Sequence, residues 1–232
     1  MSKTSAHYNI HSRFHVAVDS IIFGFEDGAI KLLIHKRRFE PFKGHWSLFG
    51  GFLQEGEGLD QGASRILLEL TGLEDIYMEV IQAYGEVDRD PAGRVISVAY
   101  SALIPAHRYS EEHSSPYGAT WVSLEDLPDL IMDHNAMVDK ALRRLRRRAA
   151  TQPIGFELLP KKFTIPQLQL LYEAIYQTEL DKRNFRKKIL STDVLIKLEE
   201  KDMSGSKKGA FLYKFDKKKY KKLVEKGYSF AI

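Results

Sequence analysis

The sequence has no cysteine among its 232 residues. The absence of thiols excludes a disulfide-stabilised secreted domain, a cysteine-ligated zinc site and a thiol nucleophile. No apolar run approaches the ~20 residues that a helix needs to cross a bilayer. The first residues, MSKTSAHYNIHSR, also carry no apolar signal segment. We therefore expect a cytoplasmic protein that does not attach to membranes.

What the chain does contain is typical of a globular protein, with 44% apolar and 28% charged residues. Its length allows one large domain or two smaller ones. The net charge of +4 hides an asymmetry, because residues 1–152 carry −4 and residues 153–232 carry +8. Such segregation favours a polyanionic partner for the C-terminal part. A solvated lysine-rich surface would have the same composition.

The pattern of strand and helix signals along the chain predicts two domains, at residues 1–150 and 151–232. In the first, strands are expected at residues 16–25, 29–34, 77–86, 95–103 and 120–122, and helices at 59–71 and 135–149. Asp27-Gly28 between two apolar runs predicts a hairpin turn, and Gly72 predicts a left-handed helix end. This order indicates a mixed α/β domain.

The second domain begins after Pro153 and Gly155 and is first helical, then β-rich. Thr164-Ile165-Pro166-Gln167 matches a capping box, and Asp181 is a natural N-cap for a second helix. Residues 194–201 and 210–215 alternate like strands of a hairpin. Helix, short turn, helix and hairpin is the order of a winged helix-turn-helix.

The most specific string of the chain runs from Gly50 to Leu73. It resembles the Nudix box, G-x5-E-x7-R-E-U-x-E-E-x-G-U, in which U is a bulky aliphatic residue. Seven positions are in register: Gly51, Glu57, Arg65, Leu67, Glu69, Gly72 and Leu73. The resemblance implies an N-terminal Nudix-like α/β/α sandwich over about residues 13–150.

Two departures from the box bear on its chemistry. Nudix enzymes hydrolyse nucleoside diphosphates with divalent cations held by box carboxylates, and magnesium needs anionic oxygen ligands. Here Ile66 and Leu70 replace two of the glutamates in the R-E-U-x-E-E segment. Glu57 and Glu69 remain, but each also has a structural interpretation, as a partner of loop amides and of Arg65. We therefore expect no metal, no cofactor and no catalysis.

A Nudix fold that keeps its shape but has lost catalytic carboxylates is predicted to keep a ligand pocket, with a polar rim and a more apolar floor. That floor favours an uncharged ligand over a metal-bound pyrophosphate. The predicted ligand-binding residues are Asp19, Arg37, Arg38, Lys43, Trp46, Glu57, Glu69, Asp88 and Arg89. Each of these residues could also be an ordinary surface or capping group.

The helix DKRNFRKKIL is predicted to read DNA. Phe185 and Ile189 share one face, while Arg183 and Lys187 lie nearly opposite. Arginine and asparagine recognise base edges, and the second helix of this motif enters the major groove. The predicted DNA-binding residues of the helix and the wing are Lys182, Arg183, Asn184, Arg186, Lys187, Ser206, Lys207 and Lys208.

The whole chain resembles the Nudix-related transcriptional regulators. The resemblance lies in the degenerate box, in RDPAGRVISVAY and in FTIPQLQLLYEAIYQTELDKRNFRKKIL, and covers about residues 13–220. It implies a homodimer that binds operator DNA and responds to a small molecule. Members respond to ADP-ribose-type nucleotides or to sugars, and the lost carboxylates favour the arabinose-responsive branch, with L-arabinose as effector.

Two other functions stay open at this stage. One is a Nudix hydrolase acting on an ADP-ribose-type nucleoside diphosphate, which Ile66 and Leu70 argue against. The other is an RNA-binding or purely structural protein, because basic helices alone do not define duplex DNA as the partner.

Overall fold

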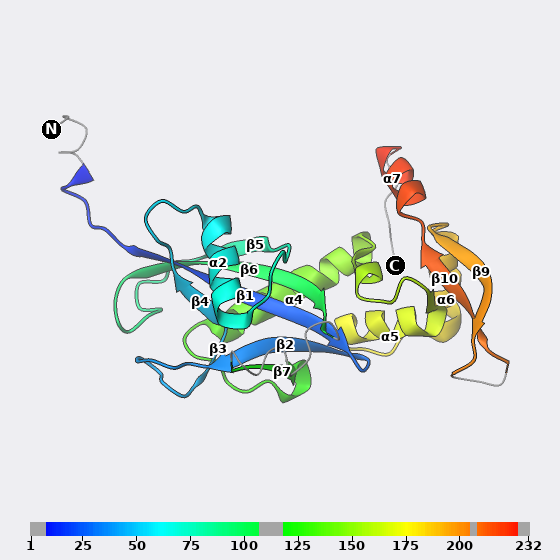
Figure 1. The fold of residues 1–232 in the computed structure, drawn as a ribbon, viewed down its shortest axis with the longest axis horizontal. Helices are drawn as coiled ribbons and strands as arrows, with labels where there is room; N and C mark the ends of the chain where they lie inside the picture. The colour runs from blue at the N-terminus through cyan, green and yellow to red at the C-terminus, as the bar shows by residue number, and fades with distance from the viewer. Residues whose placement is uncertain (1–7, 107–117, 205–207, 227–232) are drawn as a thin grey trace.

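The computed structural model describes residues 8–106, 118–204 and 208–226. Its N-terminal part is built on a seven-stranded mixed sheet (Figure 1). The strands are β1 (His15–Glu26), β2 (Ala29–Lys36), β3 (Trp46–Ser47), β4 (Phe49–Phe52), β5 (Glu79–Tyr84), β6 (Val95–Pro105) and β7 (Ala119–Ser123).

The long strand β1 organises this sheet. It pairs in parallel with β6 and antiparallel with β2 and β4, while β7 pairs with β2 and β5 with β6. The turn between β1 and β2 has positive φ at Asp27 (52°) and Gly28 (78°). Two consecutive positive φ values are what an Asp-Gly hairpin turn requires, and the predicted hairpin is confirmed.

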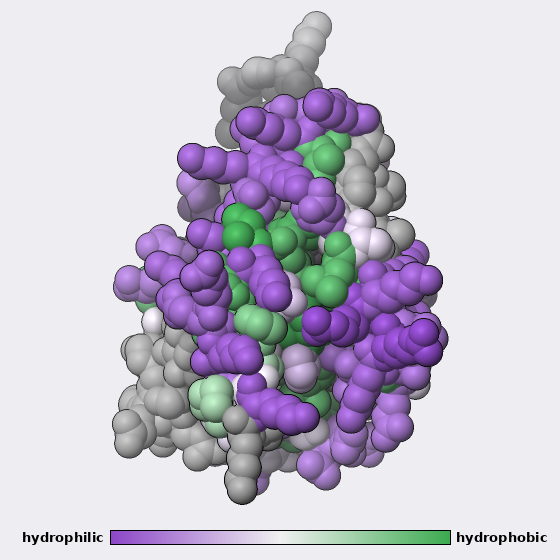
Figure 2. Space-filling model, turned by 90° about the vertical axis from the view of Figure 1, so that its right-hand side faces the viewer, coloured by the Kyte–Doolittle hydropathy of each residue, from purple (hydrophilic) through white to green (hydrophobic). Residues whose placement is uncertain are grey.

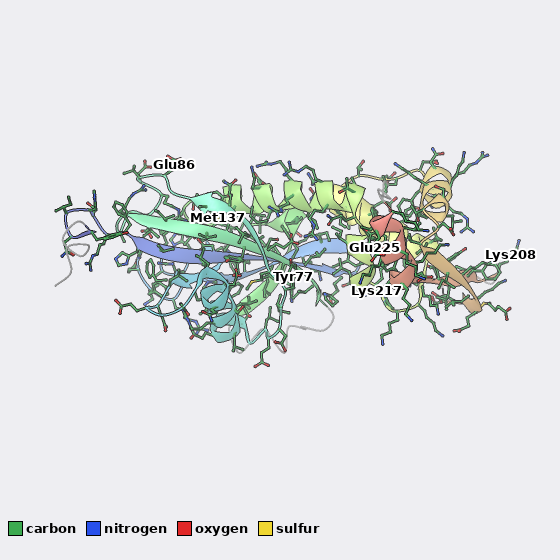
Figure 3. All side chains as sticks on the ribbon, turned by 90° about the horizontal axis from the view of Figure 1, so that it is seen from above. Tyr77, Glu86, Met137, Lys208, Lys217 and Glu225 are labelled. Carbon is green, nitrogen blue, oxygen red and sulfur yellow. The ribbon has the colours of Figure 1, made fainter. Side chains whose placement is uncertain are left out.

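Helices cover both faces of the sheet. Helix α2 (Leu59–Thr71) lies on one side and α4 (His134–Thr151) on the other, with Met137 directed from α4 toward the sheet (Figure 3). Gly72 ends α2 with φ 72° in the left-handed region, as predicted. A short 3-10 turn, η3 (Leu124–Asp126), precedes α4. The predicted α/β/α sandwich is confirmed.

The C-terminal part has the order of a winged helix-turn-helix. After the 3-10 turn η4 (Ile154–Glu157) come β8 (Phe163–Thr164), α5 (Ile165–Tyr176), α6 (Lys182–Ser191), β9 (Leu195–Asp202), β10 (Ala210–Phe215) and α7 (Lys217–Glu225). The three strands pair in the order β8-β10-β9. The Thr164 capping box and the Asp181 N-cap both form as predicted.

The two parts share one continuous apolar core. It contains Met137 and Leu145 of α4 together with Leu168 and Tyr172 of α5. The boundary at residue 150 falls within α4, whose last residue is Thr151, and stays a prediction. Among the described residues, no helix is both long and apolar enough to cross a membrane.

Candidate functional site

A chamber of about 130 Å³ opens beside the centre of β1. Its lining comes from β1, β2, β4, the loop before β6 and the start of α4. Asp19 of β1 is placed there by its register with Gly50 of β4 and Ala99 of β6. A Cβ on Gly50 would lie 2.0 Å from the Asp19 Oδ1. Glycine at position 50 therefore makes the room that the buried carboxylate occupies.

Asp19 belongs to a buried cluster of charged and polar groups. Ser97 Oγ donates a hydrogen bond of 2.5 Å to its Oδ2. The Arg89 guanidinium lies 3.7 Å from the same oxygen, but its hydrogen bonds go to Asp133, at 2.7 and 2.9 Å. The buried carboxylate is thus compensated by a nearby cation, as burial of a charge requires.

His134 closes the cluster on the side of α4. Its Nδ1 accepts a hydrogen bond of 3.1 Å from the Leu48 backbone N–H. Burial lowers the pKa of His134, although the charges of Asp19 and Asp133 oppose that change. A neutral imidazole that accepts at Nδ1 carries its proton on Nε2, which lies 3.7 Å from the Asp19 Oδ1.

Apolar side chains form the remaining walls of the chamber. They include Phe39, Phe52 and Leu70. Ile66, the other residue that replaces a glutamate of the box, is buried beside Val18 and Tyr100 and does not line the chamber. The apolar floor is expected from both replacements, and of the two Leu70 lines the chamber while Ile66 does not.

The remaining box acids are bound to one guanidinium. Glu57 lies 2.6 Å from Arg65, and Glu69 lies 3.1 Å from it. The hydrogen bond from Arg65, together with one from the Gln54 N–H, lowers the pKa of Glu57 to about 2. Both structural interpretations of these acids are confirmed.

The Nudix fold implies a divalent cation, and the residues that the structure describes do not fit one. The two acids left in the box already satisfy Arg65. Where the described ranges place side chains, no group of three histidines or carboxylates could hold a metal ion. A magnesium ion needs several anionic oxygens that are free to bind it.

A basic groove of about 510 Å³ adjoins the chamber. Its lining includes Lys36, Arg37, Arg38, Lys43 and Trp46. Arg37 lines both spaces and lies over the Phe39 ring, 4.1 Å from its centroid. Its Nε is buried and has no hydrogen-bond partner in the described part of the chain. Among the described residues, the lining of the groove has four cations and no carboxylate, which favours an anionic ligand.

The structure divides the predicted ligand residues into three groups. Asp19, Arg37 and Arg89 line the chamber. Arg38, Lys43 and Trp46 join Arg37 in the groove. Glu57, Glu69 and Asp88 line neither space.

Sequence reasoning missed His35, His134 and Asp133. His35 and His134 line the chamber, and Asp133 holds Arg89. Asp133 and His134 stand at the start of a predicted helix, where polar residues are common. Leu48 and His134 are 86 residues apart, so no local pattern could join them.

A second candidate site lies on α6. Phe185 and Ile189 are buried, at 5% and 0% exposure. The predicted reading residues Lys182, Arg183, Asn184, Arg186 and Lys187 are all exposed. No ion pair holds any of these cations in the part of the chain that the structure describes. A free basic face opposite a buried aromatic residue is the arrangement expected of a DNA-reading helix.

The wing continues this surface beyond α6. Lys197 and Lys201 lie over the Phe211 ring at 3.7 and 4.8 Å, and Lys208 lies near the far end of the wing (Figure 3). This end of the molecule is largely hydrophilic, with a narrow apolar strip through its middle (Figure 2). Ser206 and Lys207 lie outside the described residues.

Fold and sites together define a class of protein. An α/β/α domain with a degenerate Nudix box and a ligand-sized chamber is joined to a winged helix with an exposed basic helix. Comparison with known families agrees. Residues 13–145 match the NUDIX domain, and residues 155–215 match the NrtR DNA-binding winged helix domain. The chain belongs to the Nudix family, in the group whose Nudix domain precedes an NrtR-type winged helix, and the predicted fold class is confirmed.

Three relatives illustrate this group and its neighbours. The ADPR responsive transcriptional repressor NtrR of Acinetobacter baylyi is 33% identical over 86% of this chain and 81% of its own length. The ADP-ribose pyrophosphatase of Methanocaldococcus jannaschii is 32% identical over 59% of this chain and 78% of its own.

The third relative is Shewanella oneidensis NrtR, seen in complex with a 27mer DNA. It superposes with a TM-score of 0.75 at 29% identity, covering 86% of this chain and 93% of that one. Its NUDIX domain complexed with ADP ribose superposes with a TM-score of 0.53 at 29% identity, covering 62% of this chain and 99% of that one. The arabinose-responsive branch expected from the sequence is not supported by these relatives.

Proposed function

We propose that this protein is a transcriptional repressor that binds operator DNA through α6 and the wing. An ADP-ribose-type nucleotide binds the Nudix domain and changes the operator affinity. The observation that carries the proposal is the exposed basic face of α6 on a winged helix that packs against a Nudix domain. The names of the Acinetobacter and Shewanella relatives support it.

The choice of effector rests on charge. L-arabinose is uncharged and would bring no negative charge to the groove cations, among them Arg37 and Lys43. A diphosphate supplies that counter-charge, and arginine binds phosphate with paired hydrogen bonds. The relative seen with ADP ribose supports the same choice. We therefore replace the expected arabinose by an ADP-ribose-type nucleotide.

The alternative function is hydrolysis of such a nucleotide. The similarity to an ADP-ribose pyrophosphatase favours it, and the contacts of the box oppose it. Glu57 and Glu69 are bound to Arg65, while Ile66 is buried in an apolar cluster. We expect no AMP release when the protein is incubated with ADP-ribose and magnesium. Turnover with magnesium would establish the enzyme instead.

The test of the repressor uses 27-bp duplexes with a random centre, selected on the protein and then measured by fluorescence anisotropy. The proposal includes a homodimer, so selected sequences should contain an inverted repeat. Saturating ADP-ribose should change the operator Kd by about 5- to 150-fold, a typical allosteric coupling. L-arabinose at the same concentration should change nothing.

Two results would contradict the proposal at different points. Selection without any enrichment would remove sequence-specific DNA binding. If selection enriches an operator but ADP-ribose does not change the operator Kd, the proposed effector is wrong, while sequence-specific binding to DNA is retained.

A further inference from the structure

The chamber beside β1 has a size and a chemistry that select one part of a nucleotide. We infer that it takes a five-membered sugar ring with free hydroxyls, the terminal ribose of an ADP-ribose-type effector, and that Asp19 is the specificity-determining residue. The inference rests on the proposed function. It goes further by assigning each part of the ligand to a place in the pocket.

Volume limits what can enter. The chamber measures about 130 Å³, and a cavity of about 150 Å³ in another protein binds benzene. One small ring therefore fits, and a bicyclic purine does not. Phe39, Phe52 and Leu70 give the chamber apolar walls that suit the carbon face of a ring.

The polar groups decide which small ring enters. Asp19 is 6% exposed, and its Oδ2 accepts from Ser97. Among the hydrogen bonds of the described residues none reaches its Oδ1, and the His134 Nε2 lies 3.7 Å from that oxygen. A carboxylate is an acceptor only. It repels a phosphate and binds hydroxyl donors.

Arg89 does not occupy the Asp19 oxygen that would accept from the ligand hydroxyls. Both of its hydrogen bonds go to Asp133, so it supplies charge compensation while Asp19 keeps one oxygen free. Arg89 and Asp133 are therefore positioning residues for Asp19. Asp133 itself does not line the chamber.

The adjoining groove takes the charged part of the effector. Arg37 lines both spaces, and its buried Nε has no partner among the described residues. A diphosphate attached to the sugar ring would pass this guanidinium on leaving the chamber and then meet Arg38 and Lys43. The uncharged sugar ring in the chamber and the anionic diphosphate in the groove are thus two parts of one molecule.

Selectivity follows from this arrangement. ADP lacks the terminal ribose and leaves the chamber empty. NAD⁺ carries a nicotinamide on that ribose, for which 130 Å³ leaves no room. We expect wild-type protein to bind ADP-ribose at least about tenfold more tightly than either, because a hydrogen bond to a charged group contributes that much.

The experiment is isothermal titration of wild type, Asp19→Asn and Asp133→Asn with ADP-ribose, ADP and NAD⁺. Asp19→Asn keeps the shape of the side chain and loses the charge. It should weaken ADP-ribose binding by about 10- to 100-fold and change ADP binding less than about twofold. Asp133→Asn changes a carboxylate of the same cluster that lies outside the lining and positions Asp19 through Arg89. It should weaken ADP-ribose binding less than Asp19→Asn does and change ADP binding less than about twofold.

Each outcome decides between the claims. Equal wild-type affinity for ADP-ribose and ADP overturns the ribose chamber and leaves the proposed effector standing, even if Asp19→Asn does not fold. An Asp19→Asn variant that binds ADP-ribose as wild type does removes Asp19 from recognition. Wild-type protein that binds none of the three nucleotides overturns the proposed effector itself.

Discussion

At positions 66 and 70, the box helix carries isoleucine and leucine where the Nudix pattern has glutamate. Ile66 lies in an apolar cluster with Val18, Ala63 and Tyr100. Ile66 is 3% exposed, and a Cβ on Gly51 would lie only 3.0 Å from its Cδ1. Returning a glutamate to position 66 would bury a carboxylate without a partner, which costs several kcal/mol. The packing around position 66 therefore opposes a carboxylate there.

His134 provides a pH test at the scale of one residue. Burial lowers its pKa from the ordinary histidine value of 6.5. Just below pH 6.5, the imidazole is therefore protonated in the unfolded chain and still neutral in the folded chain. Stability is therefore full above about pH 6.5 and falls as the pH decreases, by at most about 1.4 kcal/mol per pH unit for one group. His35, whose pKa burial also lowers, acts in the same direction.

We expect His134→Gln to make the free energy of unfolding less dependent on pH, measured by urea titration between about pH 5 and pH 7.5. The amide oxygen of glutamine can still accept from the Leu48 N–H. His45→Gln, at an exposed position, is the control and should keep the wild-type dependence. An unchanged pH dependence in His134→Gln would mean that His134 is not the group that titrates.

At the scale of elements, local signals predicted much of the fold. The Asp27-Gly28 turn, the Gly72 helix end and the Thr164 capping box each specify a backbone conformation through nearby atoms, and each forms. Helix α7 had no such expectation, because its five lysines conceal the apolar contacts of Tyr220 and Leu223 with the core. A ligand pocket was predicted, but its full lining, which includes His35 and His134, was not, since the walls come from segments far apart in the chain.

Helix α6 allows a prediction about base reading. Arg183 is exposed on the face opposite Phe185. We expect Arg183→Ala to weaken binding to the selected operator by about 1–3 kcal/mol and to relax the preference at one base position. The measurement is anisotropy on the operator and on its single-base variants.

Lys188→Ala is the control for this prediction. Lys188 is exposed on the same helix but lies beside the buried face, so its removal should leave the base preference unchanged. Arg183→Ala with unchanged affinity and preference would exclude Arg183 from the reading face.

At the scale of the whole molecule, α4 connects the two sites. Its first turn carries His134 into the chamber, and Asp133 just before it holds Arg89. Its last turns hold the winged helix, where Arg146 donates a hydrogen bond of 3.0 Å to the Ile175 carbonyl and another to Gln177. Both acceptors lie at the C-terminal end of α5, the helix that packs against α6.

This connection predicts that Arg146 carries part of the coupling between effector and operator. Arg146→Met keeps most of the side-chain stem and removes both hydrogen bonds. We expect the ADP-ribose Kd of the DNA-free protein to stay within about twofold of wild type, because the chamber is at the other end of α4. The factor by which ADP-ribose changes the operator Kd should fall at least about fivefold, the lower end of typical coupling.

Arg147→Met is the matched control, since Arg147 is the next residue, is exposed and forms no ion pair in the described ranges. Thermal unfolding of both variants separates a loss of coupling from a loss of stability. Because coupling is reciprocal, Arg146→Met should also reduce the effect of operator DNA on ADP-ribose affinity by the same factor. An effector response that survives Arg146→Met intact would assign the transmission to other contacts between the two domains, such as those between α5 and β2.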